Sequence, residues 1–325
     1  MADQISPIPA VPAGLREAAQ VGKLIPFIGA GVSLLAGCPG WNDFADGALR
    51  WLIAQGKFSY SQFEQVRHLN PRVKLSLART LEAENGLTID YEPLLHPKKR
   101  DESEKGLRLY RSLFKLGNRF VTTNYDKWLD DRIPDTTPTA APPADPAAMA
   151  LPDPMRVVHK VSDLTPALLA EPNTVIHLHG SLRDPQGMIL TTQDYVRHYA
   201  NDRLSGDAAK ENRVLTFLEY LFANRTVLFV GYGLAELEIL EYVILKARRP
   251  PGTAVKESRH YLHPLEWNSM NQTIFCLLRH DATRRESPIS PTEIRSLEVV
   301  GPSYETLRVQ NLSASPYVAT WLATL

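Results

Sequence analysis

The sequence predicts an α/β fold with a doubly wound, parallel sheet. Short apolar runs rich in β-branched residues alternate along the chain with segments of helical periodicity, as expected for strands joined by crossover helices. Two of these runs, 24–28 and 226–230, break at glycines, which permit a sharp turn from a strand into a helix. With 325 residues, 44% of them hydrophobic, the chain can bury a large core, and we expect a single domain over 1–325.

The first third of the chain begins with one strand and continues almost entirely as helix. A short helix is expected at 13–22, before the strand at 24–28, and an amphipathic helix at about 42–54. The pattern from 59 to 116 stays helical and shows no clear strand, so we expect a helical insertion on top of the sheet at 59–116.

The rest of the chain supplies the other strands and their helices. The segment 133–154 is rich in proline and alanine and predicts a loop, because proline fixes φ and removes a backbone donor. Further strands are expected at 119–123, 156–161, 174–178, 226–230, 260–262 and 297–300, and further helices at 192–199, 211–223 and about 235–246.

Composition and charge argue against several classes of function. Lys+Arg 36 equals Asp+Glu 36, and a chain without a basic excess is not expected to bind nucleic acid directly. Two cysteines, Cys38 and Cys276, cannot build a four-thiolate zinc site, and we expect no metal. The N-terminus lacks a signal-peptide pattern, and no apolar run reaches the ~18 residues that span a bilayer, so we expect a cytoplasmic protein without membrane contact.

Glycine, hydroxyl and amide residues follow directly after four of the expected strands, at 29–33 (GAGVS), 123–126 (TNYD), 179–181 (HGS) and 231–233 (GYG). Ligands of open parallel sheets bind beyond the carboxyl ends of the strands, so these clusters predict one cleft. In the first cluster, the glycines would let a ligand approach the backbone, and exposed N–H groups would suit a phosphate. Ser33 is expected to act as a helix N-cap. A glycine turn of this kind can also serve packing alone.

The four clusters, in this order, resemble the motif set of the sirtuin superfamily, and more closely that of the bacterial sirtuin-like NAD hydrolases of antiphage defence systems. The similarity spans about 24–234, and the helical stretch 59–116 is similar only in general character. This resemblance implies a Rossmann-like sheet and NAD as the substrate.

The resemblance also implies roles for individual residues. Asn124 matches the asparagine that orients the nicotinamide ribose and the attacking water, Asp126 the aspartate that helps fix the nicotinamide end, and His179 the catalytic histidine. Gly233 stands where sirtuins usually carry a small hydroxyl residue. The residues expected to hold NAD are Gly29, Ala30, Gly31, Ser33, Thr123, Gly231 and Gly233.

Several of these residues also have a structural interpretation. His179 could be an ordinary core histidine, although its place at a strand end favours catalysis. Asn124 and Asp126 could cap a helix that starts there. His177 is expected on the other face of its strand and is interpreted as structural. Trp41 could cover the nicotinamide end or anchor the next helix.

The resemblance implies an NAD hydrolase that releases nicotinamide and ADP-ribose and depletes NAD during phage infection. Protein-deacylating sirtuins carry a four-cysteine zinc module that this chain cannot build, so deacylation or ADP-ribosyl transfer is the alternative. A non-catalytic NAD or ADP-ribose sensor is a further alternative. Since unregulated NAD hydrolysis would kill the host, we expect control through a homo-oligomer or a partner subunit, such as an ATPase, an Argonaute-like protein or a nucleotide-sensing subunit.

Overall fold

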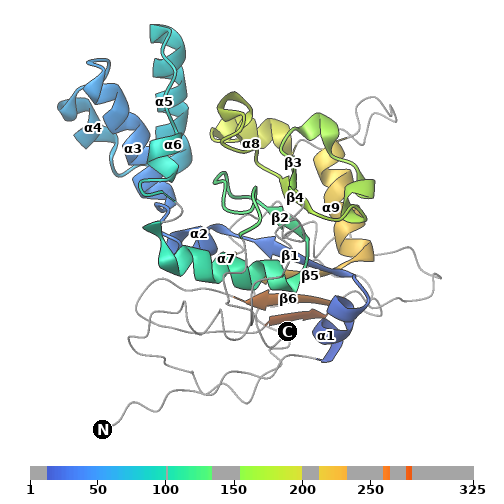
Figure 1. The fold of residues 1–325 in the computed structure, drawn as a ribbon. Coiled ribbons are helices and arrows are strands. Elements are labelled where there is room, and N and C mark those ends of the chain that lie inside the picture. The colour runs from blue at the N-terminus through green and yellow to red at the C-terminus, as the bar shows by residue number, and fades with distance from the viewer. Residues whose placement is uncertain are drawn as a thin grey trace.

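A seven-stranded sheet forms the centre of the molecule (Figure 1). The computed structural model describes residues 13–99, 102–133, 154–199, 212–232, 259–263 and 276–279. The strands are β1 (Leu24–Ile28), β2 (Arg119–Thr122), β3 (Arg156–Val158), β4 (Thr174–His177), β5 (Thr226–Val230), β6 (Arg259–His263) and β7 (Cys276–Arg279). Across the sheet their order is β3-β4-β2-β1-β5-β6-β7, so β1 is the middle strand.

The sheet is parallel except at one edge. β1 pairs in parallel with β2 and β5, β4 with β2 and β3, and β5 with β6. β7, which the sequence pattern does not predict, runs antiparallel to β6. The predicted α/β, Rossmann-like parallel sheet is therefore confirmed, and it carries an antiparallel edge strand of a kind common in mixed sheets.

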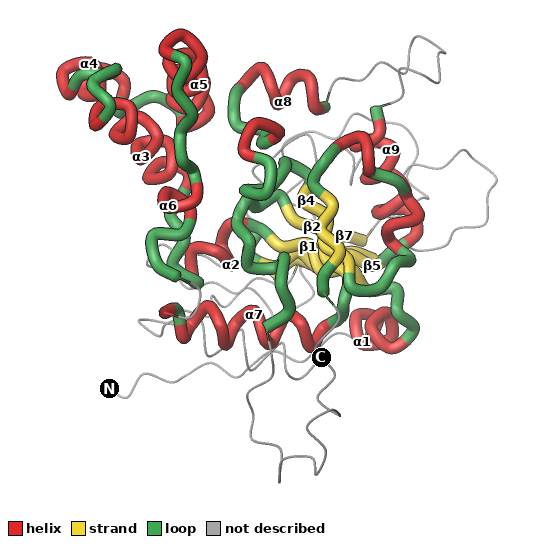
Figure 2. The backbone as a smooth tube through the Cα atoms, turned by 45° about the horizontal axis from the view of Figure 1, so that its top comes forward, coloured by secondary structure: helices red, strands yellow, loops and turns green. Residues whose placement is uncertain are grey.

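Helices cover both faces of the sheet, as Figure 2 shows. Successive residues of a strand point to opposite faces. Leu24 and Ile28 pack with helices α1, α2 and α7, whereas Ile25 and Phe27 pack with α9 on the other face. All five residues of β1 are buried, which fits a strand covered on both sides. The bounds of these helices are α1 (Ala13–Gln20), α2 (Ala30–Leu35), α7 (Glu104–Leu116) and α9 (Arg213–Asn224).

Four further helices stand together on the carboxyl-end side of the sheet (Figures 1 and 2). They are α3 (Trp41–Ala54), α4 (Tyr60–Val66), α5 (Pro71–Asn85) and α6 (Glu92–Leu95), and we call them the helical unit. Its core contains Phe44, Leu49 and Leu75 and extends to Tyr125, in the turn after β2. The stretch 59–116 is helical in its described residues, as predicted, but α7 packs on the sheet and the other helices of the stretch in the helical unit.

The observed bounds differ little from the predicted ones. The largest difference is at β3, which ends at Val158 and is followed by a 3₁₀ turn at Val161–Asp163. The predicted elements at 235–246 and 297–300 lie outside the described residues, as does 134–153 of the predicted loop.

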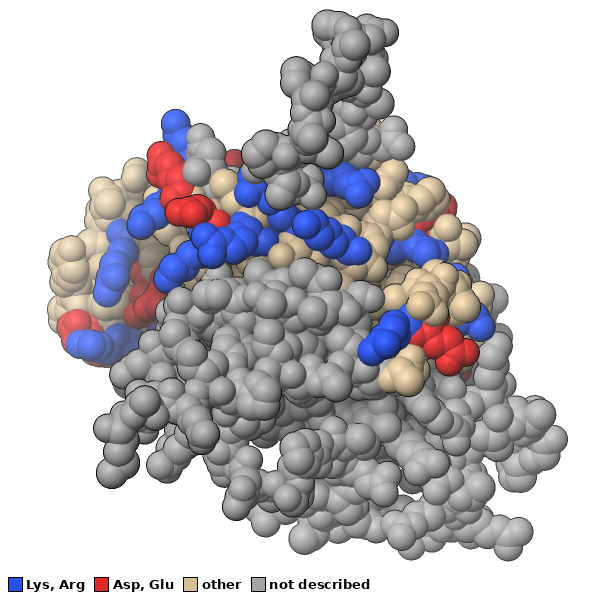
Figure 3. Space-filling view, turned by 60° about the horizontal axis from the view of Figure 1, so that its bottom comes forward, with Lys and Arg blue, Asp and Glu red and all other residues tan. Residues whose placement is uncertain are grey.

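Basic side chains gather on the face that Figure 3 turns forward. On α7, Lys105, Arg108 and Lys115 are exposed, and their spacing places them on one side of the helix. Arg108 pairs with Glu104 at 3.1 Å, so part of this charge is neutralised locally. None of the described helices is both long enough and apolar enough to cross a membrane.

Candidate functional site

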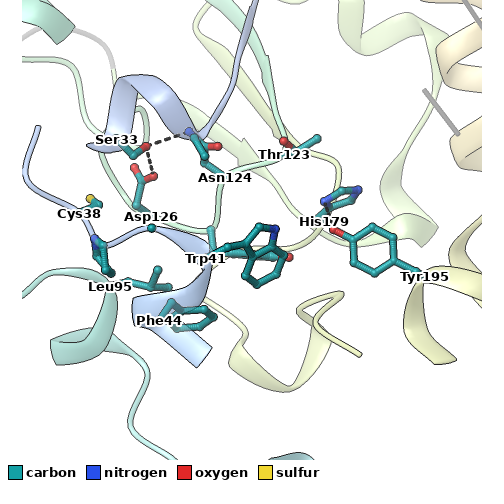
Figure 4. Close-up of a pocket in the computed structure, with 14 residues that line it drawn as sticks. Ser33, Cys38, Trp41, Phe44, Leu95, Thr123, Asn124, Asp126, His179 and Tyr195 are labelled. Carbon is teal, nitrogen blue, oxygen red and sulfur yellow. Dashed lines mark hydrogen bonds between the residues drawn. The ribbon is translucent and has the colours of Figure 1, made fainter. Parts of the chain in front are cut away.

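A pocket lies at the carboxyl ends of β1, β2 and β4, between the sheet, the helical unit and helix α8 (Thr192–His198) (Figure 4). Six of the predicted site residues line it, namely Ala30, Ser33, Thr123, Asn124, Asp126 and His179. Three others, Gly29, Gly31 and Gly231, are not among its lining residues, and Gly233 lies outside the described residues. The remaining lining residues are Cys38, Pro39, Gly40, Trp41, Phe44, Leu95, Tyr125 and Tyr195.

The Ser33 hydroxyl joins the polar residues that follow β1 and β2. It donates to Asp126 Oδ2 at 2.6 Å and accepts from Asn124 Nδ2 at 2.8 Å (Figure 4). The hydroxyl of Tyr110 lies 3.2 Å away. Because Ser33 gives its only proton to the carboxylate, Tyr110 donates to it. The hydroxyl thus has all its hydrogen bonds within the protein, and it positions Asn124 and Asp126.

The predicted role of Ser33 as a helix N-cap was wrong. The N-cap of α2 is Gly29, and Ser33 lies inside the helix. The alternative that Asn124 and Asp126 cap a helix also fails, because the described residues directly after them, 127–133, form turns and no helix. Asp126 instead closes a local turn, in which its Oδ1 accepts from the Trp128 backbone N–H at 3.0 Å.

The orientation of the Asn124 amide follows from its partners. Its Nδ2 donates to the backbone carbonyl of Gly29 at 3.0 Å as well as to Ser33. A carbonyl can only accept, so the nitrogen must face Gly29 and the oxygen must face away. Figure 4 shows this oxygen on the side of the amide that points away from Ser33.

The glycine turn after β1 makes room for the backbone after β5. A Cβ on Gly29 would lie 2.5 Å from the Gly231 carbonyl oxygen, and one on Gly31 would lie 2.9 Å from it. The Gly31 N–H donates to that same oxygen at 2.8 Å. Gly231 itself has a φ of +63°, a left-handed conformation that glycine adopts without strain. These glycines therefore serve a close backbone crossing, and the Gly31 amide is already bonded to protein.

His179 enters the pocket from the turn after β4 and is only 1% exposed. Gly180, at a φ of +82°, allows this turn, and a Cβ there would lie 2.7 Å from the Gly187 carbonyl oxygen. His179 Nε2 lies 2.6 Å from the Tyr199 hydroxyl, and Nδ1 lies 3.3 Å from the Tyr195 hydroxyl.

Burial governs the protonation of the pocket histidines. Burial, helped by the positive charge of Arg72, lowers the pKa of His179 to about 3. Burial, helped by His179, lowers the pKa of neighbouring His198 to about 3 as well. Both rings are therefore neutral at neutral pH, and a neutral imidazole can accept a proton.

His177 does not line the pocket, and the predicted reason for this was wrong. Residues two apart share a face of a strand, so alternation cannot separate His177 from His179. The two differ because β4 ends at His177 and the chain then turns. The His177 ring is 2% exposed and lies within hydrogen-bonding distance of the Asn124 carbonyl oxygen and of Asp130.

Aromatic residues form one side of the pocket, and Trp41, at the start of α3, is one of them. The Trp41 and Tyr125 ring centres are 5.8 Å apart, and Trp41 and Phe44 are 6.1 Å apart. Tyr195 and Tyr199 are four residues apart and so share a side of α8 and its end. That spacing is visible in the sequence, but nothing local indicates that α8 packs beside β4.

The pocket offers hydroxyl, amide, carboxylate and imidazole groups, together with an aromatic wall. Among the described residues, no group of three or more His, Cys, Asp or Glu side chains could hold a metal ion. Burial, with the negative charge of Asp126, raises the pKa of the Cys38 thiol. The thiol therefore stays protonated and unreactive at neutral pH.

Residues 118–273 match the family model of the SIR2-like domain. None of the curated proteins matches the chain. The matched range contains Asn124, Asp126, His179 and Gly231, whereas the glycine turn and Ser33 precede it. The match supports a place in the sirtuin-like superfamily and a function related to NAD.

Proposed function

Starting from the SIR2-like match, we propose that this protein is an NAD glycohydrolase, which converts NAD and water into nicotinamide, ADP-ribose and a proton. One observation carries the proposal. Asn124, Asp126 and His179, which follow two neighbouring strands, line a single pocket, and Ser33 bridges the first two. This is the edge of a parallel sheet where ligands bind.

The reaction breaks the bond between the ribose C1′ and the nicotinamide nitrogen. The electron pair of that bond goes to nicotinamide, which leaves as a neutral molecule and needs no strong acid. Positive charge develops on the ribose, as in glycoside hydrolysis. Water then bonds to C1′ and loses a proton. The pocket therefore needs a proton acceptor, a group that orients hydroxyls and a group that tolerates positive charge.

Each proposed role fits the side chain's surroundings. His179 is neutral, so a ring nitrogen can accept a hydrogen bond, and then the proton, from water or from a ribose hydroxyl. Burial makes it a weak base in the closed pocket, and admission of water and substrate would raise its pKa and its strength as a base. The Asn124 amide is held by Gly29 and Ser33, so its oxygen is fixed as an acceptor for a hydroxyl or water. Asp126 accepts from Ser33 and from the Trp128 N–H, and its carboxylate would favour positive charge at the nicotinamide end.

Two tyrosines enclose the His179 ring. Both ring nitrogens lie within hydrogen-bonding distance of tyrosine hydroxyls, from Tyr195 and Tyr199. Substrate or water can reach the imidazole only after one of these hydroxyls moves aside. The need to move a tyrosine before His179 can act supports the proposal that the activity is regulated.

Water is the acceptor that this proposal favours over an acyl-lysine peptide. The chain's two cysteines cannot form a four-thiolate zinc module. The helical unit, which contributes Trp41, Phe44 and Leu95, forms the wall facing the sheet.

We further propose that the protein depletes NAD in antiphage defence and acts as a homo-oligomer or with a partner subunit. The partner would be an ATPase, an Argonaute-like protein or a nucleotide-sensing subunit. The support is the resemblance of the four motifs, together with the need to keep NAD cleavage inactive in a healthy cell.

The test is nicotinamide release from NAD by the purified full chain, alone and with the products of neighbouring genes. We expect release by the wild type, and a loss of about 100-fold or more in His179→Ala and Asn124→Ala. His68→Ala, which removes an exposed histidine of the helical unit, should retain full activity. The proposal fails if the wild type never releases nicotinamide, or if the pocket variants match it. NAD binding without turnover would favour the sensor, and peptide-dependent turnover would favour the deacylase.

A further inference from the structure

A buried histidine lies directly beneath the Asn124 turn. His177 Nδ1 is 2.8 Å from the Asn124 carbonyl oxygen, and Nε2 is 2.9 Å from Asp130 Oδ1. The His177 ring is 2% exposed and the Asp130 side chain is fully buried. Both ring nitrogens therefore depend on protein partners.

Both partners of His177 are acceptors. A backbone carbonyl oxygen only accepts hydrogen bonds. Burial alone would raise the pKa of Asp130, but hydrogen bonds from His177 and Arg183 outweigh burial and lower it. Asp130 is therefore ionised at neutral pH and also only accepts. A neutral imidazole has one N–H and would leave its other nitrogen facing an acceptor lone pair.

We infer that His177 is a doubly protonated imidazolium that positions Asn124, donating one N–H to the Asn124 carbonyl oxygen and the other to Asp130. The functional part of this inference rests on the proposed NAD hydrolysis, in which Asn124 orients the reacting groups.

The neighbouring charges are consistent with a buried cation. Asp130 Oδ2 accepts from Arg183 Nε at 2.6 Å, so one carboxylate lies between two cations. Asp131 lies 4.0 Å from Arg183 and supplies a second negative charge. His159 is a further ionisable neighbour, and its pKa is lowered chiefly by burial. Asp184 and Asp130 raise the pKa of His159, and Lys160 lowers it.

His177 acts through Asn124 and not on the substrate. It is absent from the residues that line the pocket, and both of its nitrogens are engaged. Asn124 is then restrained at three points: its N–H donates to Thr122 Oγ1 at 3.0 Å, its amide donates to Gly29, and its carbonyl accepts from His177. His177 is thus a positioning residue that fixes the backbone carrying Asn124.

The direct test is the protonation of His177, measured by ¹⁵N NMR of the histidine rings in the full chain at neutral pH. We expect protons on both ring nitrogens in the wild type. In Asp130→Asn, the amide can donate to Nε2, so only the Nδ1 proton should remain. A single protonated nitrogen in the wild type overturns the inference. Neither measurement requires turnover of NAD.

The functional arm compares His177→Gln with His68→Gln, the same change at an exposed histidine. A misplaced Asn124 should lower kcat by up to about 100-fold and leave KM within about twofold. The positioning role would be overturned if His177→Gln weakened substrate binding as much as it lowered kcat, or if it left kcat unchanged. If the wild type proves unable to cleave NAD, the proposed function fails, while the NMR result still decides the charge of His177.

Discussion

The guanidinium carbon of Arg72 lies 3.6 Å from the centre of the Tyr195 ring, which joins α5 of the helical unit to α8. Tyr195 in turn lies against His179, with ring centres 5.0 Å apart. Contacts of this cation–π type contribute about 0.5–2 kcal/mol. Tyr195 therefore connects the helical unit to the pocket histidine, and Arg72 also helps to keep that histidine neutral.

Tyr199→Phe should activate the enzyme. The change removes the hydroxyl 2.6 Å from His179 Nε2. Loss of a hydrogen bond worth about 1 kcal/mol raises the population of the state in which Nε2 is accessible by about fivefold. We expect kcat/KM for nicotinamide release to rise by about that factor. Tyr60→Phe, at a 71% exposed tyrosine, should leave kcat/KM unchanged. A lower kcat/KM in Tyr199→Phe would show that the hydroxyl assists the reaction.

Stability should fall as the pH falls below about 6.5. The folded pKa of His179 is about 3, below its ordinary value of 6.5, so the unfolded chain binds more protons between these values. The stability due to neutral His179 is complete above about pH 6.5 and is lost toward about pH 3. Between about pH 7 and about pH 5 this residue alone lowers the unfolding free energy by about 2 kcal/mol.

Urea unfolding at these two pH values measures this effect. His179→Gln should lose about 2 kcal/mol less than the wild type over the same interval, whereas His68→Gln should lose as much as the wild type. Equal losses in all three proteins would show that His179 is not held neutral by the fold.

Ser33→Ala should destabilise the fold and impair catalysis together. The change leaves the buried Asn124 amide, Asp126 carboxylate and Tyr110 hydroxyl each without one partner, at a cost of about 1–3 kcal/mol in unfolding free energy. We expect kcat to fall more than KM rises. Ser162→Ala breaks an exposed hydroxyl–carboxylate contact of 3.0 Å and should change stability by less than about 0.5 kcal/mol. Similar effects in both variants would contradict the bridging role of Ser33.

Gly29→Ala should destabilise the sheet. Its Cβ would lie 2.5 Å from both the Gly231 carbonyl oxygen and the Tyr232 Cα, and backbone atoms cannot rotate away. Overpacking of this kind costs about 1–3 kcal/mol in unfolding free energy. Gly117→Ala is the matched control, because Gly117 has an extended backbone and no atom within 4 Å of the added Cβ. Thermal unfolding of the two variants checks the difference, and a fully stable Gly29→Ala would refute the close crossing.

The sequence pattern was sufficient to locate most of the sheet and part of the site. Asn124, Asp126 and His179 could be placed together because they follow strands, and parallel strands end at one edge. The partners of these residues could not be found in the same way. Tyr110 reaches Ser33 across 77 positions, and the tyrosines beside His179 depend on how α8 packs, for which no local pattern exists.

The middle strand of the sheet, β1, lies outside the range that matches the SIR2-like family model. The SIR2-like match begins at 118, but β1 is the strand that joins β3-β4-β2 to β5-β6-β7. A fragment cut at residue 117 would consist of two separate three-stranded sheets, each with an open edge, and would lack Ser33. Recovery of the pocket would then require the first hundred residues to be supplied as a second chain, so this fold suits a split-protein reporter whose two fragments regain the pocket only on reassembly.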